Sequence, residues 1–191
     1  ALLDGWSIPI VISQVLEAYD SINSGVPYNV NSSLHYKNYL EWLVSQDAEA
    51  AGDFWQEQVK DISKATSIGI DEDVINKSKE PTFKEYKFEL PEEATNNLNN
   101  FAKNTKTTVS TVFQAAWALI LSQYSGDSQV CFGVTTSGRP AELSGVDEIV
   151  GLLINTVPCI ISVDKNTSLE SWLHDIHSAH IERDKHSFFP L

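Results

Sequence analysis

Four consecutive residues near the start of the chain combine groups that can order and expose a reacting centre: Asp4, Gly5, Trp6 and Ser7. A carboxylate such as Asp4 can orient a loop through an ion pair, or it can cap the following helix. Gly5 would let a substrate approach the backbone, and it can equally form a turn. We expect Trp6 in the core and Ser7 at a helix N-cap. A cationic partner lying before Ala1 would leave the charge of Asp4 unmatched, at a cost that grows with burial.

A second group of candidate residues lies in the last third of the chain. Arg139 stands in an extended loop between Gly138 and Pro140, where it is either a functional or a surface arginine. Asn155 ends an apolar run, where its amide must find hydrogen-bond partners. It could face a substrate or satisfy the backbone at a bulge or strand end. Gly151 would permit two backbones to approach closely.

Other kinds of chemistry lack support in the sequence. The nucleophile-elbow, phosphate-loop, dinucleotide-binding and zinc-protease motifs are all absent. His174, His177 and His180 recur every three residues, whereas a helical metal pair needs a four-residue spacing and a further ligand. We therefore predict a polar helix face and no metal. His186 has no nucleophile beside it in the sequence and is a poor candidate for a base.

Several motifs follow one another in the order found in one enzyme family. Residues 1–7, ALLDGWS, resemble the tail of the HHxxxDGWS motif of nonribosomal peptide synthetase condensation domains, without its two histidines. Further stretches are similar to the YxDYAxW, FWxxxL, SGRP, VGxFVNTxP and HxxxPL motifs, and they occupy 36–42, 54–58, 137–140, 150–158 and 186–191. Asn38, Leu40 and Leu153 depart from the usual residues. The resemblance covers the whole chain.

The resemblance implies a fold and an activity. It implies a layered α/β (α+β) fold, a chloramphenicol-acetyltransferase-like lobe within a two-lobed, V-shaped condensation domain. Such domains join a carrier-bound acyl or peptidyl thioester to the amine of an aminoacyl thioester by holding both tethered substrates together. The catalytic histidine would lie before Ala1, so we expect residues 1–191 alone to be inactive.

The resemblance also implies roles for particular residues and partners. Asp4 and Gly5 would belong to the catalytic motif. The substrate tunnel would be lined by Trp6, Ser7, Arg139, Gly151 and Asn155. Phosphopantetheine arms would come from partner carrier domains, no cofactor would be bound by this domain itself, and adjacent synthetase modules would be further partners.

Four alternatives remain open at this point. Heterocyclisation domains carry DxxxxDxxS here, which Asp4 and Ser7 fit, although Gly5 and Trp6 favour condensation. Epimerisation domains share HHxxxDG. The residue pair before Ala1 would separate heterocyclisation from the others. A non-catalytic scaffold that docks carrier proteins and a free-standing CoA-dependent acyltransferase are the remaining possibilities.

Hydrophobic periodicity and punctuation predict the elements that position these residues. We expect a helix from Ser7 with an apolar face from Ile8 to Tyr19, and a second helical region from about Leu34 to Val59, bent near Gln46. The stretch from Ile62 to Pro81 reads as a linker. We place a lobe boundary within it, with 1–78 ending the first lobe and 79–191 forming most of the second.

The second half alternates strands and helices. Alternation of Tyr86, Phe88 and Leu90 predicts a strand, followed by a helix that begins at Pro91. A helix should run from Thr107 or Thr108 to near Gly126, with one apolar face formed by Val109, Val112, Phe113, Ala116 and Ile120. Strands are predicted at 129–135 and 156–163. Residues 167–170 form a capping box for a last helix.

Bulk composition limits the possible partners. The chain has 191 residues, 42% of them hydrophobic, and a formal net charge of −13. Because nucleic-acid and anionic-membrane binding need clustered basic residues, we expect neither partner. No apolar run approaches the about 20 residues that span a bilayer. Cys131 and Cys159 lack metal-ligand spacing and are predicted to be buried free thiols of a cytoplasmic protein.

Overall fold

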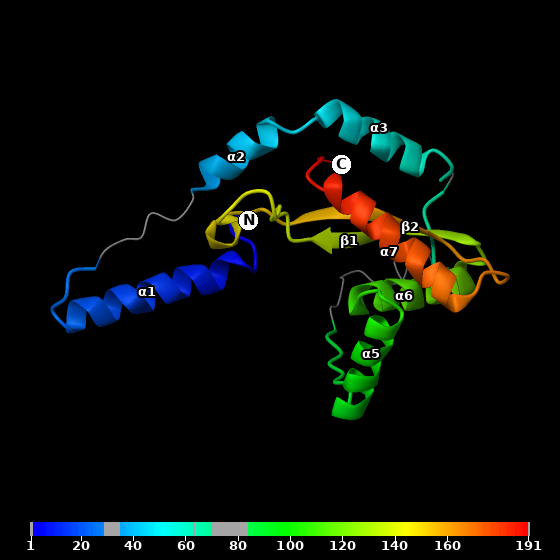
Figure 1. Ribbon diagram of the computed structural model, residues 1–191, viewed down its shortest axis with the longest axis horizontal. Coiled ribbons are helices and arrows are strands. Elements are labelled where there is room, and N and C mark those ends of the chain that lie inside the picture. Colours follow the sequence, from blue (N-terminus) through cyan, green and yellow to red (C-terminus); the bar gives the residue numbers. More distant parts are fainter. Residues whose placement is uncertain (1, 29–34, 63, 70–83, 191) are drawn as a thin grey trace, which may run out of the picture. The chain divides into compact units, whose positions relative to one another are not determined.

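The structure combines helices with a two-stranded sheet. It is a computed structural model that describes residues 2–28, 35–62, 64–69 and 84–190 (Figure 1). Its elements, in chain order, are α1 (Ser7–Asn23), α2 (Tyr36–Val44), α3 (Ala48–Val59), α5 (Glu92–Asn104), α6 (Val109–Ser125), β1 (Gln129–Thr136), the 3-10 helix η1 (Val146–Glu148), β2 (Asn155–Ser162) and α7 (Leu169–Lys185).

Two compact units share these elements. The first unit comprises Ala1–Phe54, Thr135–Val157 and Ser187–Leu191, and the second comprises Trp55–Val134 and Pro158–His186. The predicted lobe boundary at 78/79 lies outside the described residues and stays a prediction.

Strands β1 and β2 pair with each other and run antiparallel. The amide of Val163 donates to the carbonyl oxygen of Ser128 at 2.7 Å, at one end of the pair. At the other end, the Thr136 hydroxyl lies 3.5 Å from the carbonyl oxygen of Asn155. Since the start of one strand faces the end of the other, the direction is antiparallel. Both strands were predicted, and the observed ends differ from the predicted ones by at most one residue.

The core of the second unit lies where α6 and α7 pack on each other and on strand residues. Its buried apolar members are Ala115, Ala118, Leu121, Val130, Cys159, Ile161, Trp172, Leu173 and Ile176. The Trp172 indole donates to the Ser162 carbonyl oxygen at 2.7 Å, so its polar edge is satisfied while its ring is buried.

The core of the first unit is smaller. It groups Tyr39 of α2 with Val146, Ile149 and Leu153, and Trp42 and Leu143 pack against them. These residues place the segment from Ile149 to Leu153 directly against helix α2. That segment carries the backbone groups on which the candidate site is built.

Local sequence signals set the helix ends. The Thr108 hydroxyl caps α6 by accepting from the Thr111 amide at 3.1 Å, and Gly126 ends the helix with φ of 75°. Ser168, the second residue of the predicted capping box, caps α7 by accepting from the Ser171 amide at 3.2 Å. The long helical region predicted after residue 34 is two helices, α2 and α3, separated at the expected bend.

Two predictions about these elements were wrong. Residues 84–90 form no strand in the described part of the chain, and Tyr86 and Phe88 are 89% and 70% exposed. A strand needs a hydrogen-bonded neighbour, and alternation alone does not supply one. In α6, the buried face is Thr111, Gln114, Ala115, Ala118 and Leu121 rather than the predicted apolar face, whose Phe113 and Ile120 are about half exposed.

Helix α1 was predicted with its apolar face, but the face is open. Ile8, Ile12, Leu16 and Tyr19 are each more than half exposed. No helix within the described residues is long and apolar enough to cross a bilayer.

Candidate functional site

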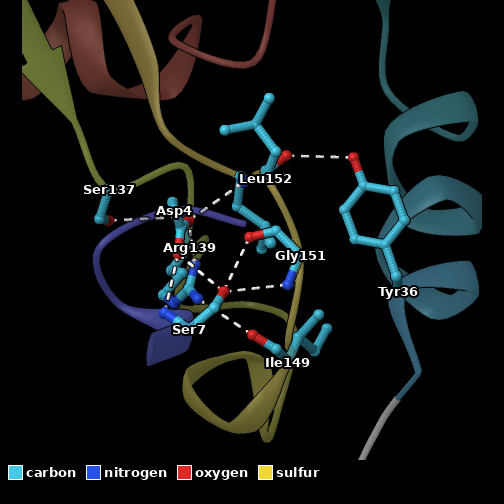
Figure 2. A network of polar contacts seen from close by, with 9 residues as sticks. Asp4, Ser7, Tyr36, Ser137, Arg139, Ile149, Gly151 and Leu152 are labelled. Atoms are coloured by element: carbon cyan, nitrogen blue, oxygen red, sulfur yellow. Dashed lines mark hydrogen bonds and ion pairs between the residues drawn. The ribbon is translucent and has the colours of Figure 1, made fainter. Parts of the chain in front are cut away.

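Asp4 is the centre of a buried polar network in the first unit (Figure 2). One carboxylate oxygen accepts from the amide and the hydroxyl of Ser7, at 2.9 and 2.8 Å. The other accepts from the Leu153 amide at 3.2 Å and from the Arg139 guanidinium at 3.3 Å. Asp4 therefore bonds the first amide of α1 and also forms an ion pair, so both interpretations of its role hold in the geometry.

Hydrogen bonds control the ionisation of Asp4. Burial alone would raise the pKa of this carboxyl. The bonds from the Ser7 hydroxyl and from the Leu153 and Ser7 amides, together with the charge of Arg139, outweigh burial and lower the pKa below its usual value. The group is therefore a fixed anion at neutral pH, which suits an orienting role better than proton exchange.

Arg139 supplies the cation that the sequence left unidentified. The side chains of Arg139 and Asp4 are only 2% and 3% exposed. The guanidinium also donates to the Ile149 carbonyl oxygen at 3.0 Å, and it lies 5.8 Å from the centre of the Trp6 ring. The partner of Asp4 therefore lies within the chain, in the predicted SGRP loop, and the expectation of a partner before Ala1 was wrong.

Ser7 joins α1 to the segment that ends at Leu153. Its hydroxyl accepts from the Gly151 amide at 3.0 Å, and lies 2.8 Å from both the Gly151 carbonyl oxygen and Asp4 Oδ1. A hydroxyl carries one proton, so it donates to one of these oxygens at a time. The predicted N-cap role was wrong: Trp6 holds the N-cap position, and Ser7 is the first helical residue.

Two glycines permit the close packing around this segment. A Cβ on Gly138 would lie 1.7 Å from the Leu153 carbonyl oxygen, and its φ is +64°. Gly138 therefore makes the backbone approach that was predicted for Gly151. A Cβ on Gly151 would instead strike the Tyr36 ring, 2.2 Å from Cδ2, so this glycine accommodates an aromatic side chain.

Gly5 and Trp6 are both on the exposed side of the motif. A Cβ on Gly5 would meet no atom within 4 Å, so the space beside it is open within the described chain. Trp6 is 58% exposed, which makes its predicted core position wrong. Its ring faces the Arg139 guanidinium, a contact that stabilises the cation without burying the indole.

Asn155 forms a clamp between β2 and the end of the chain. Its side-chain amide donates to the carbonyl oxygens of Ser187 and Phe189, at 2.8 and 3.2 Å. Its oxygen accepts from the Thr156 amide at 2.8 Å. These bonds support the strand-end interpretation, while the tunnel role of Asn155 stays a prediction.

A second buried arginine, which sequence reasoning did not select, lies in the other unit. Arg183 of α7 donates to Cys159 Sγ at 3.1 Å and to Gln114 Oε1 at 3.2 Å, and it lies 2.8 Å from His180 Nδ1. Burial raises the pKa of the Cys159 thiol, which the nearby Arg183 opposes. Cys131 and Cys159 are free thiols; Cys159 is buried, but Cys131 is only partly so.

The three histidines of α7 do not form one polar face. His177 contacts the Thr111 hydroxyl at 3.2 Å, and His180 contacts Arg183, so both take part in the packing of α7. Among the described residues, no cluster of histidine, cysteine and carboxylate side chains could hold a metal ion.

The motifs around Asp4, Arg139 and Gly151 thus converge on one site, and comparison with known proteins identifies their origin. The profile of the condensation-domain family matches residues 1–191. The chain belongs to the condensation-domain family. The recognition made from the motifs of a nonribosomal peptide synthetase is confirmed, and the site residues described above are those of a condensation domain.

Relatives of this condensation domain include large peptide synthases. The chain is 39% identical over 190 residues to part of the linear gramicidin synthase of Brevibacillus parabrevis, and 38% identical over 194 residues to chondramide synthase cmdD of Chondromyces crocatus. Each match covers 100% of the chain but only 4% and 5% of those relatives. The chain thus spans a small part of the proteins it resembles.

Solved structures confirm the fold of the domain. The first condensation domain of the calcium-dependent antibiotic synthetase, in complex with a substrate analogue, matches with a TM-score of 0.74 at 18% identity, over 98% of this chain and 42% of that one. The X-domain from teicoplanin biosynthesis matches with a TM-score of 0.74 at 15% identity, over 100% of this chain and 44% of that one. The predicted mixed α and β, chloramphenicol-acetyltransferase-like fold is confirmed.

Proposed function

We propose that the condensation domain to which this chain belongs forms amide bonds between carrier-bound substrates. The amine nitrogen of an aminoacyl thioester attacks the carbonyl carbon of a donor acyl or peptidyl thioester. The carbon–sulfur bond breaks, the donor carrier's pantetheine thiol leaves, and the amine proton is released. Holding both substrates in one place supplies much of the rate, because the reaction becomes effectively intramolecular.

The observation that carries this proposal is the ordering of the DGWS motif in a member of this family. Asp4 accepts from Ser7, Leu153 and Arg139, so the loop that leads into α1 is fixed from several directions. Gly5 lies in this loop with open space beside it. Asp4 and Arg139 thus act as orienting residues, and Gly5 leaves room for the acceptor amine.

The remaining roles follow from the same hypothesis. Trp6, Ser7, Arg139, Gly151 and Asn155 would border the substrate tunnel, and residues 1–78 and 79–191 would belong to successive lobes of one domain. Phosphopantetheine arms on carrier domains would bring the substrates in, and adjacent synthetase modules would supply those carriers. The cytoplasm is the compartment that this chemistry would share with its amino-acid substrates.

The test uses the longest natural protein that contains residues 1–191, with its donor and acceptor carrier domains loaded. Mass spectrometry of the acceptor carrier should show the donor acyl group added through an amide. A product that has lost a further water would favour heterocyclisation, and inversion of the donor without transfer would favour epimerisation. Fully loaded carriers with no product would contradict the proposal.

One glycine pair separates a substrate role from a structural one. Gly5→Ala adds a methyl group where nothing in the described chain would meet it, so we expect the melting temperature to hold while kcat falls about tenfold. The matched control is Gly138→Ala, which forces a Cβ against the Leu153 carbonyl and should destabilise the protein. Full activity of Gly5→Ala would remove Gly5 from the site.

A further inference from the structure

The peptide groups of Gly151, Leu152 and Leu153 are held from two directions. From one side, Ser7 contacts the amide and carbonyl of Gly151, and Asp4 Oδ2 accepts from the Leu153 amide at 3.2 Å. From the other, the Tyr36 hydroxyl donates to the Leu152 carbonyl oxygen at 3.1 Å. Figure 2 shows the segment passing between Tyr36 of α2 and the group formed by Asp4, Ser7 and Arg139.

The position of the Tyr36 ring is tightly defined. A Cβ on Gly151 would lie 2.2 Å from its Cδ2 and 2.7 Å from its Cε2, so the ring occupies space that only glycine leaves open. On α2, its centre lies 5.7 Å from the Tyr39 ring, which stacks on Trp42 at 5.8 Å. The phenol is therefore held by the segment on one face and by its own helix on the other.

This arrangement couples α2 to the DGWS motif through a short stretch of backbone. A shift of the Leu152 carbonyl must also move the neighbouring peptide groups, because peptide units are planar. Those neighbours are the partners of Ser7 and Asp4. Tyr36 does not touch Asp4 itself, so any effect it has on the motif passes through residues 151–153.

We propose that Tyr36 is a positioning residue for amide-bond formation, acting through the peptide groups of residues 151–153 on Asp4 and Ser7. The inference rests on the proposed function of this domain. The ring of Tyr36 fixes the distance between α2 and Gly151, and its hydroxyl fixes the rotation of the Leu152 peptide. Loss of the hydroxyl alone leaves the packing intact and releases that rotation.

The experiment compares Tyr36→Phe with Tyr39→Phe in the natural protein that contains this chain. Both variants lose one hydroxyl from α2. Tyr39 is 7% exposed, and its hydroxyl makes no hydrogen bond within the described residues. We expect Tyr36→Phe to lower kcat about tenfold with KM for the loaded acceptor carrier unchanged, since small misplacements near a reacting centre are costly. Tyr39→Phe should keep wild-type kcat.

Hydrogen exchange provides a readout that does not depend on catalysis. The amides of Gly151 and Leu153 should exchange faster in Tyr36→Phe than in wild type, and at the wild-type rate in Tyr39→Phe. Wild-type kcat and unchanged exchange in Tyr36→Phe would overturn the inference. Equal losses of kcat in both variants would also overturn it, because they would reflect general loosening of α2.

The two levels of the argument fail in different ways. Absence of amide product with the wild-type protein would contradict the proposed function. Normal product formation by wild type and Tyr36→Phe alike would contradict only the role of Tyr36. Combining Tyr36→Phe with Gly151→Ala sharpens the test, because the alanine already displaces the ring and the second change should then cost less than it does alone.

Discussion

The two arginines of the chain are both buried, but only one of them faces a carboxylate. Arg139, in the first unit, pairs with Asp4 at 3.3 Å. Arg183, in the second unit, is 6% exposed and contacts a thiol, a side-chain amide and an imidazole. Within the described residues, no carboxylate lies within ion-pair distance of Arg183. In both side chains, Nε is buried without a hydrogen-bond partner in the described structure.

The difference shows two ways of keeping a cation inside a protein. The charge of Arg139 is matched, so removing either member of the pair leaves an uncompensated ion. The charge of Arg183 is only solvated by neutral acceptors, so its own removal would relieve a cost of burial. Arg139 should therefore be indispensable to its unit, whereas Arg183 should be replaceable.

The largest effect is expected from breaking the matched pair. Arg139→Met should lower the free energy of unfolding by about 3 kcal/mol, because it leaves the Asp4 carboxylate buried without its cation. Asp4→Ala should be comparably destabilising and should abolish product formation. Urea denaturation measures both. A well-folded, fully active Asp4→Ala protein would contradict the orienting role.

A smaller loss is expected at the Asn155 clamp. Asn155→Ala removes the donors that reach the Ser187 and Phe189 carbonyls, and should cost about 1–2 kcal/mol. The melting temperature and kcat should be measured together. A fall in kcat with unchanged melting temperature would instead favour the tunnel role of Asn155.

The neutral surroundings of Arg183 make the second unit sensitive to acid. Burial lowers the pKa of His180 below 6.5; Asp184 opposes this shift, and Arg183 and His177 add to it. The unfolded chain therefore binds a proton more readily, and stability present at neutral pH should be lost as pH falls below 6.5. Denaturation at about pH 7.5 and about pH 5.5 checks this, because the range brackets histidine titration. A slope that persists in His180→Gln would assign the loss to other groups.

The smallest effect is expected from Arg183→Met. The change removes a buried charge and keeps the side-chain length, while Gln114 loses one of its contacts. Since a buried ion can often be replaced by an apolar residue at little cost, we expect the free energy of unfolding to change by less than about 1 kcal/mol. A loss as large as that of Arg139→Met would erase the distinction between the two arginines.

Much of the fold and part of the site could be predicted from sequence. Caps and breakers fixed the ends of α6 at Thr108 and Gly126, because these signals act locally. Local patterns could not place Tyr86 in a sheet, since pairing depends on residues elsewhere in the chain. The buried face of α6 was missed because Thr111 and Gln114 are polar and their burial depends on partners in α7 and β2.

In the site, the motifs identified the right residues but not their pairing. Asp4 and Arg139 were both selected, yet 135 positions separate them and no periodic pattern connects them. Gly138 and Tyr36 were named only within motifs, and their roles depend on backbone groups of 151–153 that side-chain types do not reveal. An arginine within a glycine–proline loop, in a chain with only two arginines, was the available signal for the partner of Asp4.

The most direct test of this account is a double-mutant cycle between Asp4 and Arg139, with Asp4→Asn, Arg139→Met and the combined variant compared with wild type by urea denaturation. We predict a coupling energy of about 2 kcal/mol or more, because each single change leaves a buried charge and the double change leaves none. A coupling near zero would mean that the pair does not hold the motif in place, and would contradict the account.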